Sequence, residues 1–412
     1  MLQRLGFPAV GEHRRFVTAI AVDAVGSGVF MPVSMLYFLA VTDLTLLQVG
    51  SAISLATLVS LPLGPVVGSL VDRLGAKRLL LAGNALQAAS FAAYLVVDSF
   101  AGVLAWTVVG ALGRTCFWGS FGNIVTTISQ PGQRERWFGF LGALRNVGFA
   151  IGGLASGLAV TIGTDSAFAA VVAVNAISYL VALWLLLAVP EVRPTAHEPL
   201  PGSWRTVLAN RPYRLLVLAQ AGYSLPMMIL NYALPVYAVT VLDLPGWVIG
   251  VVFTVNCLMV GFGQGLVVNA MSGRVRVRML LLTQAVFVAS YAIFLGVSVL
   301  PVLAATAVLV LGGVVYTLAE LTGGPVLAAL AAEAAPDHLR GRYLSLVQIA
   351  WNGTGAVAPV MFAWLLERGA APLWWVMAVV ALASALVIAA LGRSMPEAAD
   401  RVMRRHEQTV AA

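Results

Sequence analysis

Long apolar stretches and short polar gaps alternate along the whole chain. Each stretch is near or above the roughly 20 residues that a helix needs to cross the hydrocarbon core of a bilayer. The pattern predicts an all-α membrane protein with 12 transmembrane helices. The predicted spans are roughly 16–41, 46–70, 78–97, 101–128, 140–162, 167–189, 214–241, 247–270, 279–300, 302–331, 343–366 and 372–392.

The composition agrees with this interpretation and excludes a water-soluble fold. Hydrophobic residues make up 60% of the 412 residues, charged residues only 10%, and the mean hydropathy is +0.93. A soluble protein of this length could not cover its surface with so few polar side chains. Cys116 and Cys257 both fall inside predicted spans, so we expect neither a disulfide framework nor a metal cluster.

The gaps between spans differ in charge, and this difference predicts the orientation. Every second gap is basic, whereas the intervening gaps are mainly acidic. The basic gaps contain Arg14, Arg15, Arg73, Lys77, Arg78, Arg134, Arg136, Arg274, Arg276, Arg278, Arg340 and Arg342. The other gaps contain Asp43, Asp98, Asp165, Asp243 and Glu367. The positive-inside rule then places both termini in the cytoplasm. The net charge of +7 is explained by topology and anionic lipid, without a nucleic-acid partner.

A proline-rich segment divides the chain into similar halves. We expect an N-terminal six-helix bundle (1–189), a cytoplasmic linker (190–213), a C-terminal six-helix bundle (214–392) and a cytoplasmic tail (393–412). Arg136 and Asn146 recur 206 residues later as Arg342 and Asn352, at equivalent topological positions. A duplicated unit forming two pseudo-symmetric bundles around a central site is a transporter architecture.

A motif after the second span carries a family resemblance. The chain reads Gly68-Ser69-Leu70-Val71-Asp72-Arg73-Leu74-Gly75-Ala76-Lys77-Arg78. It resembles the G-x-L-x-D-R-x-G-x-K/R-R/K signature of the major facilitator superfamily, at the expected place between helices 2 and 3. The resemblance implies the major facilitator fold and a cytoplasmic gate that latches the halves when that side is closed. The gate residues would be Gly68, Asp72, Arg73, Gly75, Lys77 and Arg78. The two glycines are expected to allow close helix contact and a tight turn.

Within that superfamily the chain most resembles the twelve-helix drug:proton antiporters. The run Gly148-Phe149-Ala150-Ile151-Gly152-Gly153 is similar to their G-P-x-x-G-G motif, with Phe149 in place of proline. Arg114 resembles the membrane-embedded arginine of a second motif, whose glycine is displaced by one residue here, to Gly119. The resemblance implies a transporter of the bacterial inner membrane, driven by a proton gradient without a cofactor.

Four charged residues lie within predicted spans, where charge is costly unless paired or hydrated: Asp23, Arg114, Arg145 and Glu320. In the family, helices 1, 4, 7 and 10 line the central cavity, and three of the four charges fall on them. Loss of hydration favours a neutral acid, whereas a nearby arginine favours the carboxylate. We hypothesise that Asp23 and Glu320 take up protons and that Arg114 is their counter-charge. The alternative is a permanent Arg114–Glu320 pair that fastens the halves. Arg145 is expected to face the cytoplasm and to be structural.

Helical spacing around these charges predicts the substrate cavity. The expected lining residues are Ser27, Phe30, Ser34, Tyr37, Trp118, Phe121, Gln220, Ser224, Met227, Asn231, Tyr316, Gln348, Trp351 and Asn352. Aromatic and methionine side chains around one or two acids suit lipophilic substrates, including cations. We also expect bends at Pro226 and Pro235 in span 7, and a break at Gly323-Gly324-Pro325 in span 10.

These features predict a proton-coupled exporter that uses alternating access and acts as a monomer among membrane lipids. Proton-coupled uptake of a sugar or another metabolite, and a lipid flippase of the same fold, remain alternatives. A membrane enzyme or receptor is the alternative from another class. The sequence has no phosphate-binding loop, HExxH motif or nucleophile–base pair that would indicate catalysis, and all four histidines lie outside the spans.

Overall fold

The computed structural model describes residues 10–129, 134–189, 204–335 and 340–394. The helices of the first half are α1 (Arg14–Phe30), α2 (Ser34–Val41), α3 (Leu46–Ser60), α4 (Leu63–Leu74), α5 (Ala76–Tyr94), α6 (Phe100–Ile128), α7 (Arg134–Ile162) and α8 (Asp165–Leu187). Those of the second half are α9 (Trp204–Ala209), α10 (Arg211–Ser224), α11 (Leu234–Val236), α12 (Trp247–Met271), α13 (Arg276–Val297), α14 (Val302–Glu333), α15 (Arg340–Leu366) and α16 (Ala370–Gly392).

The helices confirm the predicted membrane architecture. Ten described helices or continuous helical segments are long and apolar enough to cross a bilayer. An eleventh span is made by α3 and α4 together, which are bent by 48°. The helix α5, predicted as the third span, has 19 residues and is not among these apolar segments; it carries polar side chains such as Asn84 and Gln87. The protein therefore spans the membrane many times.

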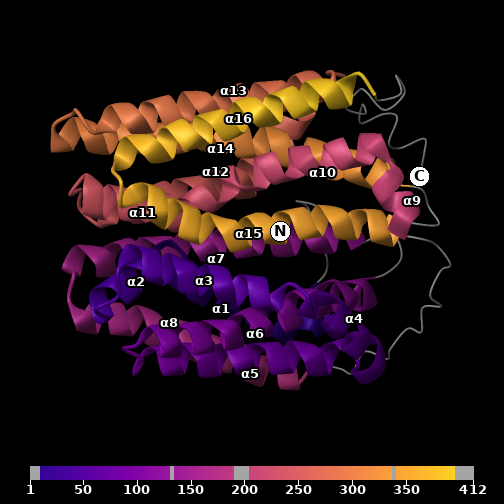
Figure 1. Ribbon diagram of the computed structural model, residues 1–412. Coiled ribbons are helices and arrows are strands. Elements are labelled where there is room, and N and C mark those ends of the chain that lie inside the picture. Colours follow the sequence, from indigo (N-terminus) through magenta and orange to yellow (C-terminus); the bar gives the residue numbers. More distant parts are fainter. Residues whose placement is uncertain (1–9, 130–133, 190–203, 336–339, 395–412) are drawn as a thin grey trace.

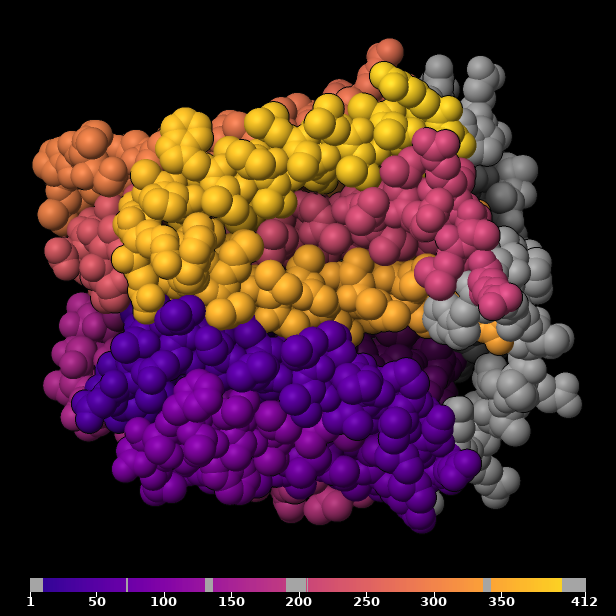
Figure 2. Space-filling view, in the orientation of Figure 1, coloured from indigo at the N-terminus to yellow at the C-terminus, as the bar shows by residue number. Residues whose placement is uncertain are grey.

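The helices lie roughly side by side, with α1–α8 on one side of the molecule and α10–α16 on the other (Figure 1). Figure 2 shows the indigo-to-magenta first half meeting the orange α15 along one seam. Most of the predicted linker (190–203) and tail (395–412) lies outside the described residues, and the proposed domain boundaries stay a prediction. The short helix α9 falls within the range predicted as linker.

A repeated hydrogen bond relates the two halves. The Tyr37 hydroxyl donates to the Tyr94 carbonyl at 2.8 Å, and the Tyr237 hydroxyl donates to the Phe294 carbonyl at 2.7 Å. Both bonds join residues 57 apart, and the second lies 200 residues after the first. The same buried contact thus ties span 1 to span 3 and span 7 to span 9, which supports the predicted internal repeat.

Span 7 is irregular where prolines predicted bends. After α10 the chain forms a 3-10 turn at Pro226–Met228, then wider π turns at Ile229–Ala233 and Tyr237–Val241. The short α11, which contains Pro235, separates the two π turns. Proline removes a backbone donor, so the regular hydrogen-bond ladder cannot run through these positions.

The expectation of a break in span 10 is wrong, because α14 continues through Pro325. Pro325 has no N–H to offer the Leu321 carbonyl, but the Gln264 side-chain amide donates to that oxygen at 3.1 Å. The Tyr223 hydroxyl donates to the neighbouring Glu320 carbonyl at 2.9 Å. Neighbouring helices therefore supply the bonds that keep α14 helical, as is common in membrane spans.

The two halves contact each other closely at the end of the bundle opposite to the one where α1 and α10 begin and α16 ends. We call the latter the terminal end; it is on the right in Figure 1. At the opposite end α7 packs on α12 through glycines, since a Cβ on Gly250 would strike the backbone of Gly153 and Gly157. There too, the Val360 amide of α15 donates to the Ser54 hydroxyl of α3 at 3.0 Å. Small residues allow this backbone approach.

Candidate functional site

A cleft of about 430 Å³ is lined by residues of the second half, and its residues on α12, α14 and α15 lie in the parts of these helices nearer the terminal end. Its walls come from α10, the following 3-10 turn, α12, α14 and α15. The lining residues are Gln220, Tyr223, Met227, Gln264, Glu320, Gly324, Pro325, Ala328, Val347, Gln348 and Trp351. Apolar walls with a few convergent polar groups are typical of a small-molecule site.

Glu320 is the acidic group of this cleft. One carboxylate oxygen accepts a hydrogen bond from the Asn256 amide at 2.6 Å, and the same amide contacts the Thr317 hydroxyl at 3.0 Å. Among the described residues no basic side chain forms an ion pair with Glu320. The cleft wall thus carries an acid held by a neutral donor, which leaves its charge free for a proton or a cation.

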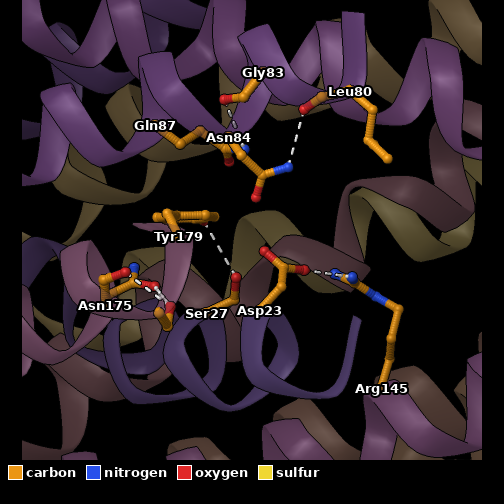
Figure 3. Close-up of polar contacts among 10 residues, drawn as sticks. Asp23, Ser27, Leu80, Gly83, Asn84, Gln87, Arg145, Asn175 and Tyr179 are labelled. Carbon is orange, nitrogen blue, oxygen red and sulfur yellow. Dashed lines mark hydrogen bonds and ion pairs between the residues drawn. The ribbon is translucent and has the colours of Figure 1, made fainter. Parts of the chain in front are cut away.

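Asp23 lies in a different place and has a different partner. It is only 3% exposed, and its carboxylate pairs with Arg145 of α7 at 2.7 Å (Figure 3). The Arg145 guanidinium also lies over the Trp118 ring, 4.8 Å from its centroid. A cation over an aromatic face is stabilised by the ring quadrupole. Arg145 is therefore a partly buried ion-pair partner, which agrees with the expected structural role, and its orientation toward the cytoplasm stays a prediction.

Glycines of the run that begins at Gly148 explain how Arg145 reaches Asp23. Cβ atoms on Gly148 and Gly152 would strike α1 at Ala24 and Gly28, so α7 and α1 approach closely along this face. Arg145 lies one turn before Gly148 on the same helix. The resemblance to the exporter motif thus falls on a segment whose observed role is helix packing.

Arg114 is exposed on α6 and forms no ion pair among the described residues. The predicted role as counter-charge to Asp23 or Glu320 is not observed, and neither is the alternative Arg114–Glu320 pair. Arg114 lies one turn from Trp118, on the side of α6 that Arg145 approaches. Helical spacing within α6 did not indicate which arginine reaches Asp23.

Several predicted cavity residues do lie on or beside the cleft wall. Gln220, Met227, Gln348 and Trp351 line it together with Glu320. Ser224 and Asn352 accept hydrogen bonds from the side chains of Gln220 and Gln348, at 2.9 and 3.1 Å. Trp118 is half exposed, beneath the Arg145 guanidinium.

Other predicted cavity residues contact neighbouring helices and are not among the cleft residues, so their place in a substrate cavity stays a prediction. They are Ser27, Phe30, Ser34, Tyr37, Phe121 and Tyr316. Tyr316, for example, is fully buried and donates to the Pro226 carbonyl at 2.9 Å. Asn231 has a buried side-chain oxygen without a partner and is not among the cleft residues. A polar stripe marks one face of a helix but does not tell whether the neighbour is the cavity or another helix of the same half.

Sequence reasoning missed Asn256, Gln264 and Tyr223. The two amides were visible as polar residues inside the apolar span 8, a position that normally requires a partner. Tyr223 lies one residue before Ser224, which was predicted, and it contacts the glycines after Glu320. These three residues surround Glu320 and the segment of α14 that follows it.

The gate motif is only partly described. Gly75 turns the chain between α4 and α5 with φ of 89°, as expected for a tight turn. Lys77 donates to the Leu187 carbonyl at the end of α8, at 2.8 Å. Gly68 makes no close contact, since a Cβ there would meet open space, and Arg73 is exposed. The Asp72 side chain lies outside the described residues, and the latch role stays a prediction.

Comparisons with known proteins agree with this architecture. The model of the Major Facilitator Superfamily matches residues 16–322. The multidrug resistance protein MdtH of Aeromonas hydrophila is 30% identical over 202 residues, covering 48% of this chain and 49% of that protein. The class C tetracycline resistance protein of Escherichia coli is 30% identical over 188 residues, covering 44% and 46%. The chain thus matches about half the length of these relatives.

Solved structures share the whole fold at low identity. A D-xylose-proton symporter aligns with a TM-score of 0.71 at 14% identity, over 91% of this chain and 96% of that one. A bacterial homologue of the iron transporter ferroportin, in an inward-facing state, aligns with a TM-score of 0.74 at 14% identity, over 92% and 97%. Identity at this level supports a shared fold and not a shared substrate.

Proposed function

The chain belongs to the Major Facilitator Superfamily, and from that premise we propose that it exports small lipophilic compounds, including cations, in exchange for protons. In this proposal it resides in a bacterial inner membrane with both termini in the cytoplasm. The terminal end, nearer which the cleft lies, then faces the cytoplasm. The named relatives in multidrug and tetracycline resistance support export.

Glu320 carries the proposal. Its carboxylate lies in the cleft wall, held by Asn256 at 2.6 Å, without an ion-pair partner among the described residues. One such carboxylate is occupied either by a proton or by a cationic substrate, because a bare charge at membrane depth is costly. Mutual exclusion at one site is sufficient to couple the two movements in opposite directions.

The chemistry of the walls fits adaptable binding of lipophilic compounds. Met227, Trp351 and Tyr223 provide polarizable and aromatic surface next to Glu320. Aromatic faces and a carboxylate both attract organic cations. Methionine adapts its shape to different partners, as in promiscuous binding surfaces.

The contacts between the halves support alternating access in this proposal. The glycine contacts of α7 with α12 and the α3–α15 contacts close the end opposite the terminal end. In our proposal the protein binds substrate from the cytoplasm in this state. The halves then rock so that these seams open and the terminal end closes, and an external proton replaces the substrate on Glu320.

Efflux of a lipophilic cationic dye tests the proposal. Cells without their own efflux pumps should export ethidium when they express the chain, and a protonophore should abolish export. Glu320→Gln should reduce export at least tenfold, whereas Asp98→Asn, an exposed acid in a loop, should have little effect. Export that persists after the gradient collapses, or in Glu320→Gln, contradicts proton coupling at this site.

One observation favours the second candidate, uptake of a hydroxylated metabolite. Three glutamine side chains, from Gln220, Gln264 and Gln348, line the cleft. Amides on several sides suit hydroxyl groups better than a purely lipophilic ligand. Proton-driven accumulation of a labelled sugar, inhibited by Glu320→Gln, with no dye export, would select this candidate.

A further inference from the structure

Asp23 and Asn84 lie at the same level on two parallel helices. Both α1 and α5 begin at the terminal end, and the rings of Phe30 and Phe91 contact each other with centroids 4.7 Å apart. Asp23 precedes Phe30 by seven residues, and Asn84 precedes Phe91 by seven residues. Seven residues are close to two helical turns, so both side chains project from the same faces as the contacting rings. Figure 3 shows the Asn84 amide pointing toward the space beside Asp23, Ser27 and Tyr179.

The orientation of the Asn84 amide is fixed. Its nitrogen donates to the Leu80 carbonyl at 3.0 Å, and therefore its oxygen points away from that carbonyl. The residue is fully buried, and the oxygen has no hydrogen-bond partner. Buried polar atoms are nearly always hydrogen-bonded, so an orphaned acceptor indicates a donor that is absent from this state.

The surroundings of Asp23 restrict what that donor is. Among the described residues, Arg145 on α7 and Tyr179 on α8 are the charged and titratable groups that interact with Asp23, and Arg114 on α6 acts on Tyr179. Arg145 already neutralises the carboxylate, which disfavours a metal cation at the same place. The Tyr179 hydroxyl is 3.2 Å from the Ser27 hydroxyl. A protonated Asp23 would supply one O–H donor, which an ionised Asp23 lacks.

We propose that Asn84 is the acceptor that holds the proton on Asp23. This inference deepens the proposed function, since it assigns a second proton site separate from the Glu320 cleft. In the ionised state Asp23 pairs with Arg145. A proton from water then binds the free carboxylate oxygen, the resulting O–H donates to the Asn84 oxygen, and the Arg145 ion pair is lost. Arg145 stays charged over the Trp118 ring, 4.8 Å from its centroid.

Infrared difference spectroscopy of the whole protein in lipid nanodiscs tests this assignment. Lowering the pH should produce a carboxylic-acid C=O band that is absent in Asp23→Asn. In Asn84→Leu, a near-isosteric change without an acceptor, this band should shift to higher wavenumber and appear only at lower pH, by about one unit. The sign follows because the lost hydrogen bond had stabilised the protonated form. Asn84→Thr, which keeps a hydroxyl acceptor, should give a smaller shift.

Tyr179→Phe is the matched control, because it keeps the ring and removes a hydroxyl near Asp23 while Asn84 stays in place. It should leave the Asp23 band unchanged. Three results would overturn the inference. The band could be unchanged in Asn84→Leu, or it could shift in Tyr179→Phe by the amount expected for Asn84→Leu. The third result is that no Asp23 band appears at any pH. These spectra do not require transport, so failure of this inference can be distinguished from failure of the proposed function. Dye export that depends on Glu320 without an Asp23 band defeats only this inference, whereas the expected bands without gradient-driven export defeat only the proposed function.

Discussion

Two acids within the membrane are held in opposite ways, and the difference explains their proposed roles. Glu320 faces a cleft with the neutral Asn256 as its partner, whereas Asp23 is buried against Arg145. Removing one partner of a buried pair leaves an uncompensated charge, which costs more than the pair contributes. The Asp23–Arg145 pair therefore matters for stability as well as for any proton transfer.

Arg145→Met should destabilise the protein by about 3–5 kcal/mol, because it leaves the Asp23 carboxylate buried without a counter-charge. Thermal unfolding of the purified protein measures this loss. The double variant Asp23→Asn/Arg145→Met removes both charges and should recover most of the lost stability. If the double variant is no more stable than Arg145→Met, the interaction at 2.7 Å is not the reason for the loss.

At the scale of the elements, α14 stays helical through Pro325 because of a bond from another helix. Gln264 of α12 donates to the Leu321 carbonyl, to which Pro325 cannot donate because it has no backbone N–H. Gln264→Leu should leave that partly buried oxygen without its side-chain donor and cost about 1–3 kcal/mol. Adding Pro325→Ala restores an intrahelical donor and should cancel most of the cost. A double-mutant cycle by thermal unfolding measures the coupling, and simple additivity of the two changes contradicts this explanation.

The α7–α12 seam predicts an effect on conformation. Gly157→Leu places a side chain against the backbone of Gly250 and should prevent the closed end from forming. The protein should then spend more time open at the end opposite the termini. Spin labels at the start of α3 and at the end of α15, both at this end of the bundle, should report a longer distance between the two helices. Gly139→Leu on the same helix, where a Cβ meets open space, should leave the distance unchanged. Equal distances in both variants would show that this seam does not control closure.

At the scale of the whole molecule, hydropathy was sufficient to predict a helical protein that spans the membrane many times. Span ends agree within a few residues because apolar length and capping are local properties. The site was predicted less well. Gln220, Met227, Glu320, Gln348 and Trp351 reached the cleft, whereas Tyr37 and Tyr316 turned inward to bond backbone carbonyls. Which helix faces which, and hence the choice of Arg145 over Arg114, depends on packing between distant segments, which the periodicity of one helix does not encode.

Transport by purified protein in liposomes, under an imposed pH gradient, tests the central claim most directly. The wild type should move ethidium against its concentration gradient when protons flow the opposite way. Glu320→Gln should lose this active transport yet retain exchange of labelled for unlabelled substrate, because its cleft keeps its amide and aromatic walls. Gradient-driven transport by Glu320→Gln at the wild-type rate would contradict the account.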